Sequence, residues 1–199
     1  VNKGDNSDKF VNIGGLGVLS RFIATVKGEP RLYGIIALGY IAGPSERSAE
    51  AIIHVHGIEY LRDALETETS TDIKAAACYS LGQIGRHSPK HANKVSENNT
   101  LQLILELYTS RDTSDDLKGK AKRSLRKIIA NVDILNFLEP FLKKAPPEIM
   151  KLILTQYYKH LKNTTTYKKD FVEHGCLKIL QELKCNSEYN EEMKRLIDT

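Results

Sequence analysis

The chain has 199 residues, of which 41% are hydrophobic and 27% charged, and its formal net charge is +4. This composition supports a sizeable core, and the total charge is too weakly basic to indicate nucleic-acid binding without a local patch. No apolar run approaches the roughly 18 residues that cross a membrane, and no signal peptide is recognisable. The three cysteines, Cys78, Cys176 and Cys185, stand in unrelated contexts, which favours reduced thiols of an intracellular compartment over a disulfide framework.

In chain order, the sequence predicts a succession of short helices. Residues 1–9 are polar and we expect them to fray, whereas helical stretches follow from Phe10 onward. Ser45 and Ser88 suit N-cap positions. Prolines that suit the first turn of a helix recur along the chain, at Pro30, Pro44, Pro89 and Pro146. In the middle of the chain the predicted helices cover about 45–56, 58–67 and 72–86.

An internal repeat organises these helices. Three short segments can be superposed at a step of 42 residues, namely Gly15 with Leu19, Gly57 with Leu61, and Asn99 with Leu103. The later helices keep nearly the same spacing, at Leu38, Leu81 and Leu125. A period of about 40–47 residues made of two or three helices is typical of armadillo or HEAT repeats. The sequence therefore predicts an all-α, right-handed superhelical armadillo solenoid of roughly four to five repeats, with one continuous core and a long concave surface.

The repeat also predicts the domain organisation. We expect a single array over residues 10–199, with successive units at about 10–43, 44–86, 87–131, 132–161 and 162–199. In the third unit Asn99 replaces the glycine that opens the second helix elsewhere, and Asn tolerates a turn with positive φ. The last unit is polar, as a terminal cap requires. Because the chain begins with Val1 and a repeat has already started by Val11, we expect a fragment of a longer array.

No group of residues in the sequence indicates catalysis, a metal or a cofactor. The glycine-rich segment 13–17 lacks the preceding strand and the Lys-Ser/Thr pair of a phosphate-binding loop. We interpret the histidines as surface or turn residues because zinc needs further ligands at suitable spacing, and this applies to His54, His56, His87 and His91. Cys78 lies among alanines and is expected to be an inert core thiol. The sequence thus predicts a protein that is not an enzyme.

The informative surface is the one that the third helix of each repeat would form. In armadillo proteins two positions four apart on each third helix point into the concave groove. Alignment on the three leucines gives the pairs Ile36 with Tyr40, Tyr79 with Gln83, and Arg123 with Lys127. Nuclear-import receptors of this fold carry Trp and Asn at these places, whereas this chain has no Trp and no Asn at any of the six positions. An import receptor is therefore excluded.

The third pair belongs to a basic patch that also contains Lys118, Lys120, Lys122 and Arg126. One interpretation is a solvated helix face. The other is an electropositive end of the groove that attracts an acidic partner. Nucleic acid is disfavoured because aromatic residues that could stack on bases are not interleaved with these charges.

Several runs in the chain resemble the sperm-associated antigen six family, armadillo proteins of the flagellar central pair. These runs are IKAAA at 73–77, LGQIGRH at 81–87, LEPFL at 138–142 and APP at 145–147. The resemblance extends from about Phe10 to the end of the chain in the same order and spacing. Departures are Tyr79, where the family tends to have Trp, and Cys176, where another small residue is usual.

The resemblance implies a non-catalytic scaffold of the axonemal central apparatus, associated with central-pair microtubules and needed for flagellar motility. Its partners would be central-pair proteins and tubulin, with no nucleic acid and no membrane. Its place would be the cytoskeleton of the flagellar or ciliary axoneme, on the reducing cytoplasmic side. The alternative is an armadillo adaptor of the signalling or transport type, which binds an extended acidic peptide in its groove. Self-association is left open by the sequence.

Overall fold

The computed structural model describes residues 3–163, 171–184 and 194. Throughout these ranges the regular elements are helices, and no strand occurs. None of the helices described is both long and apolar enough to cross a membrane. The chain divides into two compact units, Val1–Asn131 and Val132–Thr199.

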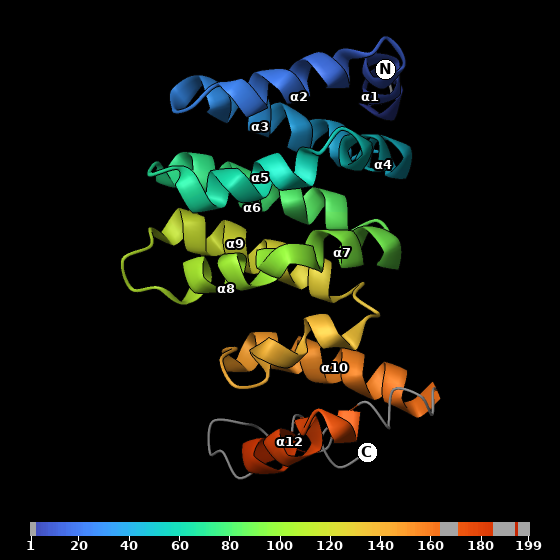
Figure 1. Ribbon diagram of the computed structural model, residues 1–199, viewed down its shortest axis with the longest axis vertical. Helices are drawn as coiled ribbons and strands as arrows, with labels where there is room; N and C mark the ends of the chain where they lie inside the picture. Colours follow the sequence, from blue (N-terminus) through green and yellow to red (C-terminus); the bar gives the residue numbers. More distant parts are fainter. Residues whose placement is uncertain (1–2, 164–170, 185–193, 195–199) are drawn as a thin grey trace. The chain divides into compact units, whose positions relative to one another are not determined.

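The first unit consists of three successive trios of helices (Figure 1). The first trio is α1 (Lys3–Asn12), α2 (Gly15–Thr25) and α3 (Glu29–Ala42). The second is α4 (Glu46–His54), α5 (Gly57–Thr67) and α6 (Thr71–Gly85). The third is α7 (Pro89–Ser96), α8 (Thr100–Thr109) and α9 (Asp115–Ile129), with a 3₁₀ turn, η1 (Glu97–Asn99), before α8. Each trio is one armadillo-type repeat, and its last helix is called the third helix below.

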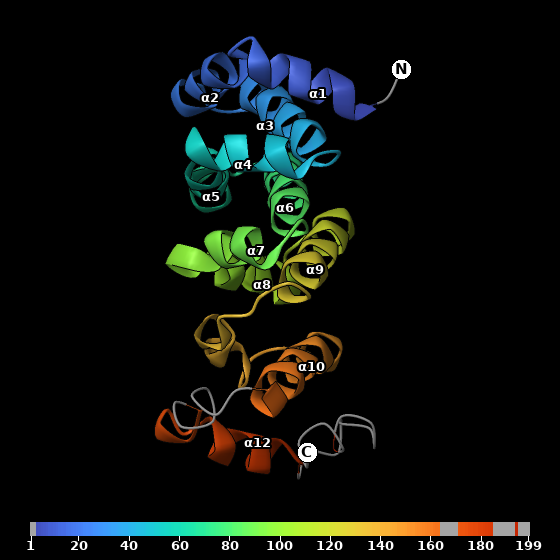
Figure 2. The same ribbon diagram turned by 90° about the vertical axis from the view of Figure 1, so that its right-hand side faces the viewer.

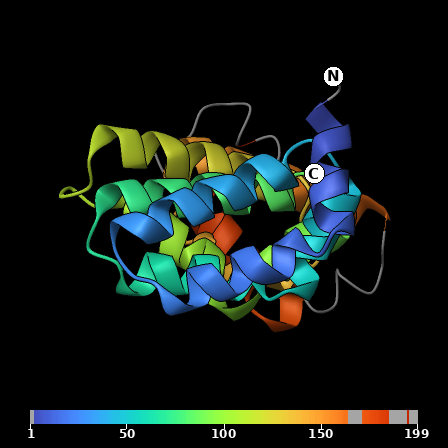
Figure 3. The ribbon, with the colours of Figure 1, turned by 90° about the horizontal axis from the view of Figure 1, so that it is seen from above.

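The third helices α3, α6 and α9 lie side by side, and Figures 2 and 3 show them together along one side of this unit. The repeating leucines Leu38, Leu81 and Leu125 are fully buried between the helices. Small residues permit the close approach. A Cβ atom added to Gly82 would lie 3.0 Å from the backbone Cα atom of Ser124 on α9. One repeat earlier, the Ser80 hydroxyl donates a hydrogen bond of 2.9 Å to the Ile35 carbonyl oxygen on α3.

The N-terminal segment differs from the expectation of a frayed stretch over residues 1–9, because residues 3–12 form the helix α1. Contacts with α4 and α2 hold this polar helix. The Ser48 hydroxyl donates a hydrogen bond to the Asp8 carboxylate at 3.0 Å, and Arg47 donates one to the Asn12 side chain at 3.0 Å. Phe10 packs against Gly15, where a side chain would collide with its ring. Tertiary contacts therefore outweigh the weak local preference for a helix.

The turn before the second helix differs from the sequence prediction in the first two repeats, whereas in the third the predicted positive φ of Asn99 is confirmed. The residues with positive φ in these turns are Gly14 (79°), His56 (60°), and Asn98 (54°) together with Asn99 (61°). In the first two repeats this is the residue before the glycine that the repeat alignment singles out. The aligned Gly57 serves close packing instead, since a Cβ atom there would lie 2.9 Å from the Ile52 carbonyl oxygen.

In the second unit two 3₁₀ turns, η2 (Leu135–Phe137) and η3 (Glu139–Phe141), precede the long helix α10 (Pro147–Asn163). The helix α12 (Cys176–Lys184) follows after Gly175, which has a φ of 73°. The core includes Tyr157 and Phe171, whose ring centroids are 5.1 Å apart, and the Tyr157 hydroxyl donates a hydrogen bond of 3.3 Å to the Leu135 carbonyl oxygen.

Candidate functional site

All six residues predicted to line the groove lie on the third helices of the first unit. Ile36 and Tyr40 are on α3, and Tyr79 and Gln83 are on α6. Arg123 and Lys127 are on α9. Three adjoining hollows open on this side, and Tyr79 lines each of them. We call this surface the groove face and define it by these six residues.

The first hollow, called the Ile36 hollow, is lined mainly by α3 and α6, with two residues of α9, and has a volume of about 340 Å³. Its walls are largely apolar, from Leu32, Ile36, Tyr40, Ala75, Ala76 and Tyr79. Tyr40 is 67% exposed, and the Tyr40 and Tyr79 rings are 6.1 Å apart at a tilt of 57°. Two carboxylates, Asp72 and Asp116, stand at one end together with Lys120. This hollow can therefore accept an apolar side chain and disfavours an anion at its acidic end.

The second hollow, called the Arg123 hollow, lies between α6 and α9 and has a volume of about 270 Å³. It is lined by Tyr79, Gly82, Lys120, Arg123, Ser124 and Lys127. The Lys127 ammonium lies 5.9 Å from the centroid of the Tyr79 ring, within the range of a cation–π contact. Burial, and then the positive charges of Arg86 and Arg123, lower the pKa of Lys127 below its ordinary value. The Arg123 hollow is therefore a region of concentrated positive charge.

The three cations Arg86, Arg123 and Lys127 are called the cation cluster below. Gln83 contacts two of them and lines a third hollow of about 520 Å³ together with Arg86, Tyr40 and Tyr79. Its side chain is only 8% exposed. The Gln83 Oε1 atom accepts a hydrogen bond from Arg86 at 3.3 Å and another from Lys127 at 3.4 Å. Among the described residues no carboxylate pairs with Arg86, Arg123 or Lys127. One neutral amide oxygen thus lies between two cations that have no counter-ion in the described parts of the chain.

Arg86 was not among the predicted groove residues. It follows Gln83 by three positions, at the C-terminal end of α6, and so lies about one helical turn further on. The alignment of the third helices predicts groove positions in pairs four apart, and on α6 the pair ends at Gln83. The signal that could have found Arg86 is this continuation of the Tyr79–Gln83 side of the helix.

The structure divides the predicted basic patch. Lys120 lines both the Ile36 hollow and the Arg123 hollow, and its ammonium lies 3.9 Å from the Asp116 carboxylate. Lys118, Lys122 and Arg126 line none of the three hollows. Their spacing of four residues places them on a different stripe of α9 from Arg123 and Lys127. Only part of the basic run therefore belongs to the groove face.

The interpretation of His91 as a surface or turn residue is wrong. Its side chain is 2% exposed, and its ring centroid lies 6.0 Å from that of His87, although a new helix begins between them at Pro89. Ser88, between them, has an extended backbone. The two histidines therefore do not belong to one continuous helix, and their rings are near each other because of the turn between α6 and α7. Even so, the described residues contain no group of three or more His, Cys, Asp or Glu side chains that could hold a metal ion.

The described cysteines are buried thiols. Cys78 is fully buried, and burial raises its pKa to about 12. Cys176 is 1% exposed, and burial together with the nearby Glu139 carboxylate raises its pKa to about 11. The two thiols therefore lack the activated, accessible character of a catalytic nucleophile. Cys185 lies outside the described residues.

The fold defines an armadillo-repeat protein, as the sequence predicted. A designed armadillo repeat protein solved in complex with the peptide (KR)4 has a TM-score of 0.62 at 18% identity, covering 98% of this chain and 84% of its own. Another engineered protein has a TM-score of 0.64 at 22% identity, covering 98% of this chain and 83% of its own. At these identities the likeness concerns the fold alone.

No protein-family model matches the chain. The resemblance noted in the sequence is nevertheless confirmed by comparison with individual proteins. Over 120 residues, 60% of its length, the chain is 44% identical to sperm-associated antigen 6 of Homo sapiens. Over the same length it is 43% identical to sperm-associated antigen 6 of Mus musculus. The aligned region is 24% of the length of these relatives, so the chain matches about a quarter of each.

Proposed function

We propose that this chain is part of a non-catalytic interaction scaffold of the axonemal central apparatus, which contacts central-pair microtubules and their associated proteins and serves flagellar motility. The observation that carries the proposal is the 44% identity with sperm-associated antigen 6 over 120 residues, joined to a fold whose open face is built for contact.

The groove face supports this role through two kinds of contact. Tyr40, Tyr79 and Gln83 provide neutral surface that can pack against, or hydrogen-bond to, an extended segment. Arg123 and Lys127 provide positive charge that attracts an acidic partner and accelerates its encounter. Modest contacts repeated along an array sum to high avidity, which suits a scaffold better than a single tight pocket.

The test is co-sedimentation of the purified chain with microtubules, with and without their acidic tails, across a salt series. Tail-dependent binding that weakens as salt rises is the expected result, because exposed charges more than about 8 Å apart are screened at physiological ionic strength. Absence of binding at low salt would overturn a direct tubulin contact. The same assay with isolated central-pair proteins would then decide between them and tubulin.

Two matched variants locate the surface. Arg123→Glu with Lys127→Glu reverses two charges on the groove face, and Lys118→Glu with Arg126→Glu reverses two charges elsewhere on the same helix. We expect the first pair to weaken co-sedimentation and the second to retain it. An equal loss in both would point to net charge rather than to the groove face.

A further inference from the structure

We propose that the groove face recognises a short extended segment of a partner protein that carries a large apolar side chain and, two residues along, an anionic one. The apolar side chain occupies the Ile36 hollow and the anion occupies the Arg123 hollow. This inference rests on the proposed scaffold function and specifies what its groove accepts.

The anion-binding part follows from the charges around Gln83. The Arg86 guanidinium and the Lys127 ammonium both donate to its amide oxygen, which carries no charge to offset them. Arg123 lines the adjoining hollow, and none of the three cations has a carboxylate partner in the described portion of the chain. Because like charges held together in a partly buried site repel, a bound anion would lower the free energy of this cluster. The depressed pKa of Lys127 has the same cause, since burial and two neighbouring cations disfavour its charged form.

The apolar part follows from the composition of the Ile36 hollow. Leu32, Ile36, Ala75 and Ala76 contribute aliphatic groups to its lining, and Tyr40, which also lines it, has 67% of its surface exposed. A lining of aliphatic and exposed aromatic groups is usual for a site that anchors a large apolar side chain. Asp72 and Asp116 at its end repel an anion, so the acidic group of a ligand has only one of the two hollows to occupy.

The spacing between the two groups follows from helix packing. The hollows adjoin, since both include Tyr79 and Lys120; most of the Ile36 hollow is lined by α3 and α6, and the Arg123 hollow is lined by α6 and α9. Packed helices are about 8–10 Å apart, so the two sites are separated by roughly one such step. An extended chain advances about 3.3 Å per residue, and its alternate side chains point to the same side. That distance covers two to three residues, and only a spacing of two keeps both side chains on the same side, so the apolar and anionic residues of the ligand are two positions apart.

Carboxylate and phosphate share the chemistry that this cluster selects. Arginine forms paired hydrogen bonds with either group, and lysine binds either as a point charge. A partner segment could thus present an acidic residue or a phosphorylated one, and the experiment has an arm for each.

The experiment uses the full 199-residue chain and fluorescein-labelled peptides of Gly and Ser, with binding followed by fluorescence anisotropy. One peptide carries Leu-Ser-Glu-Glu and a second carries Leu-Ser-phosphoserine. Two controls replace Leu by Ala or the acidic residues by Gln. We expect each control to bind roughly tenfold more weakly than its parent. Tight binding by the phosphoserine peptide alone would assign the site to phosphate, and comparable binding by both would show that carboxylate suffices.

Variants of the protein make the assignment specific to the two hollows. Arg123→Glu with Lys127→Glu should abolish the preference for the acidic peptides, whereas Lys118→Glu with Arg126→Glu should keep it. Ile36→Ser should remove the preference for Leu over Ala and leave the salt dependence intact. Equal binding of the Leu and Ala peptides by the unmodified chain, or an equal loss in both charge variants, would overturn the inference.

The peptide-binding experiment and the microtubule co-sedimentation experiment test different claims and can fail independently. Loss of peptide selectivity while the chain still co-sediments with microtubules refutes this inference alone. Selective peptide binding without co-sedimentation refutes the tubulin contact and leaves the peptide site standing.

Discussion

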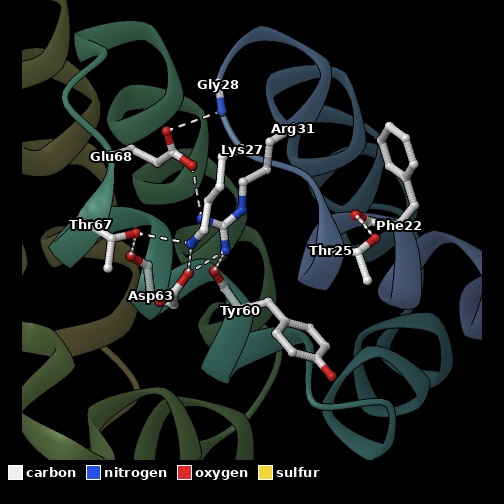
Figure 4. A network of polar contacts seen from close by, with 9 residues as sticks. All are labelled: Phe22, Thr25, Lys27, Gly28, Arg31, Tyr60, Asp63, Thr67 and Glu68. Carbon is white, nitrogen blue, oxygen red and sulfur yellow. Dashed lines mark hydrogen bonds and ion pairs between the residues drawn. The ribbon is translucent and has the colours of Figure 1, made fainter.

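The Arg31 guanidinium donates a hydrogen bond of 2.9 Å to the Glu68 carboxylate (Figure 4). Because Arg31 lies on α3 and Glu68 follows α5, this bond joins the third helix of the first repeat to the second repeat. The two side chains are 1% and 8% exposed. Arg31 also donates to the Asp63 carboxylate at 2.6 Å and to the Tyr60 carbonyl oxygen at 3.2 Å. A buried arginine is thereby neutralised by two acidic groups of the neighbouring repeat.

Glu68→Gln should destabilise the first unit. The substitution removes the more buried of the two carboxylates that pair with Arg31 and leaves the Asp63 pair in place. A hydrogen bond to a charged group contributes about 1.5–3 kcal/mol, and we expect a loss of that size in the free energy of unfolding. Lys27→Ala is the control, because Lys27 pairs with Asp63 in the same network but is 56% exposed. Exposed pairs contribute about 1 kcal/mol or less. Urea unfolding followed by circular dichroism measures both, and equal stability of the two variants would contradict the prediction.

Two glycines on neighbouring third helices should respond in opposite ways to alanine. At Gly82 a methyl group would lie 2.9 Å from the Ser124 hydroxyl and 3.0 Å from its Cα atom, so α6 and α9 would have to separate. We expect a loss of about 1–3 kcal/mol. At Gly119, inside α9, a methyl group would meet only the Arg123 guanidinium, at 3.8 Å. There alanine should stabilise by about 0.5–1 kcal/mol because it favours the helix. Thermal unfolding of the two variants tests the pair, and a destabilised Gly119→Ala would contradict it.

The groove positions could be predicted from the sequence because they depend on local periodicity and on a repeat of fixed length. Once Leu38, Leu81 and Leu125 are aligned, positions four apart on one helix face follow from helical geometry. Leu38, for instance, is fully buried, which leaves Ile36 and Tyr40 to line a hollow on the same helix.

Other features could not be predicted because they depend on partners distant in sequence. Arg31 is a charged residue near a helix start and gives no local sign of burial; only the fold brings it to Asp63 and Glu68. Arg86 becomes part of the cation cluster because α9 packs beside α6 and brings Lys127 to Gln83. The histidine pair and the helix α1 likewise depend on contacts between helices.

His91 should make the stability of the first unit depend on pH. Burial lowers the pKa of His91, and this effect outweighs the carboxylates of Glu50 and Glu46, which raise it; His87 and Lys90 lower it further. The folded state therefore prefers the neutral ring. Above the ordinary value of about 6.5 the stabilisation is complete, and it decreases as the pH falls from there toward the folded-state pKa.

The measurement is the free energy of urea unfolding between about pH 7.5 and pH 5.5, where one such group contributes a slope of at most about 1.4 kcal/mol per pH unit. His91→Gln should flatten this slope relative to the unmodified chain. His54→Gln is the control, because His54 is 73% exposed, and it should leave the slope unchanged. If the two glutamine variants show the same pH profile, His91 does not carry the dependence.

The two buried thiols should report on the opening of each unit separately. Cys78 lies in the first unit and Cys176 in the second, and burial is the main cause of the raised pKa of each. In a Cys185→Ser background, native protein at pH 8 should react with iodoacetamide at least about a hundredfold more slowly than a free thiol, and Cys78 more slowly than Cys176, since only the thiolate reacts. In rising urea each thiol should become reactive when its own unit unfolds, which mass spectrometry of the labelled peptides can follow. Rapid labelling of Cys78 without denaturant would contradict its burial, and rapid labelling of Cys176 alone would show that the second unit opens under native conditions.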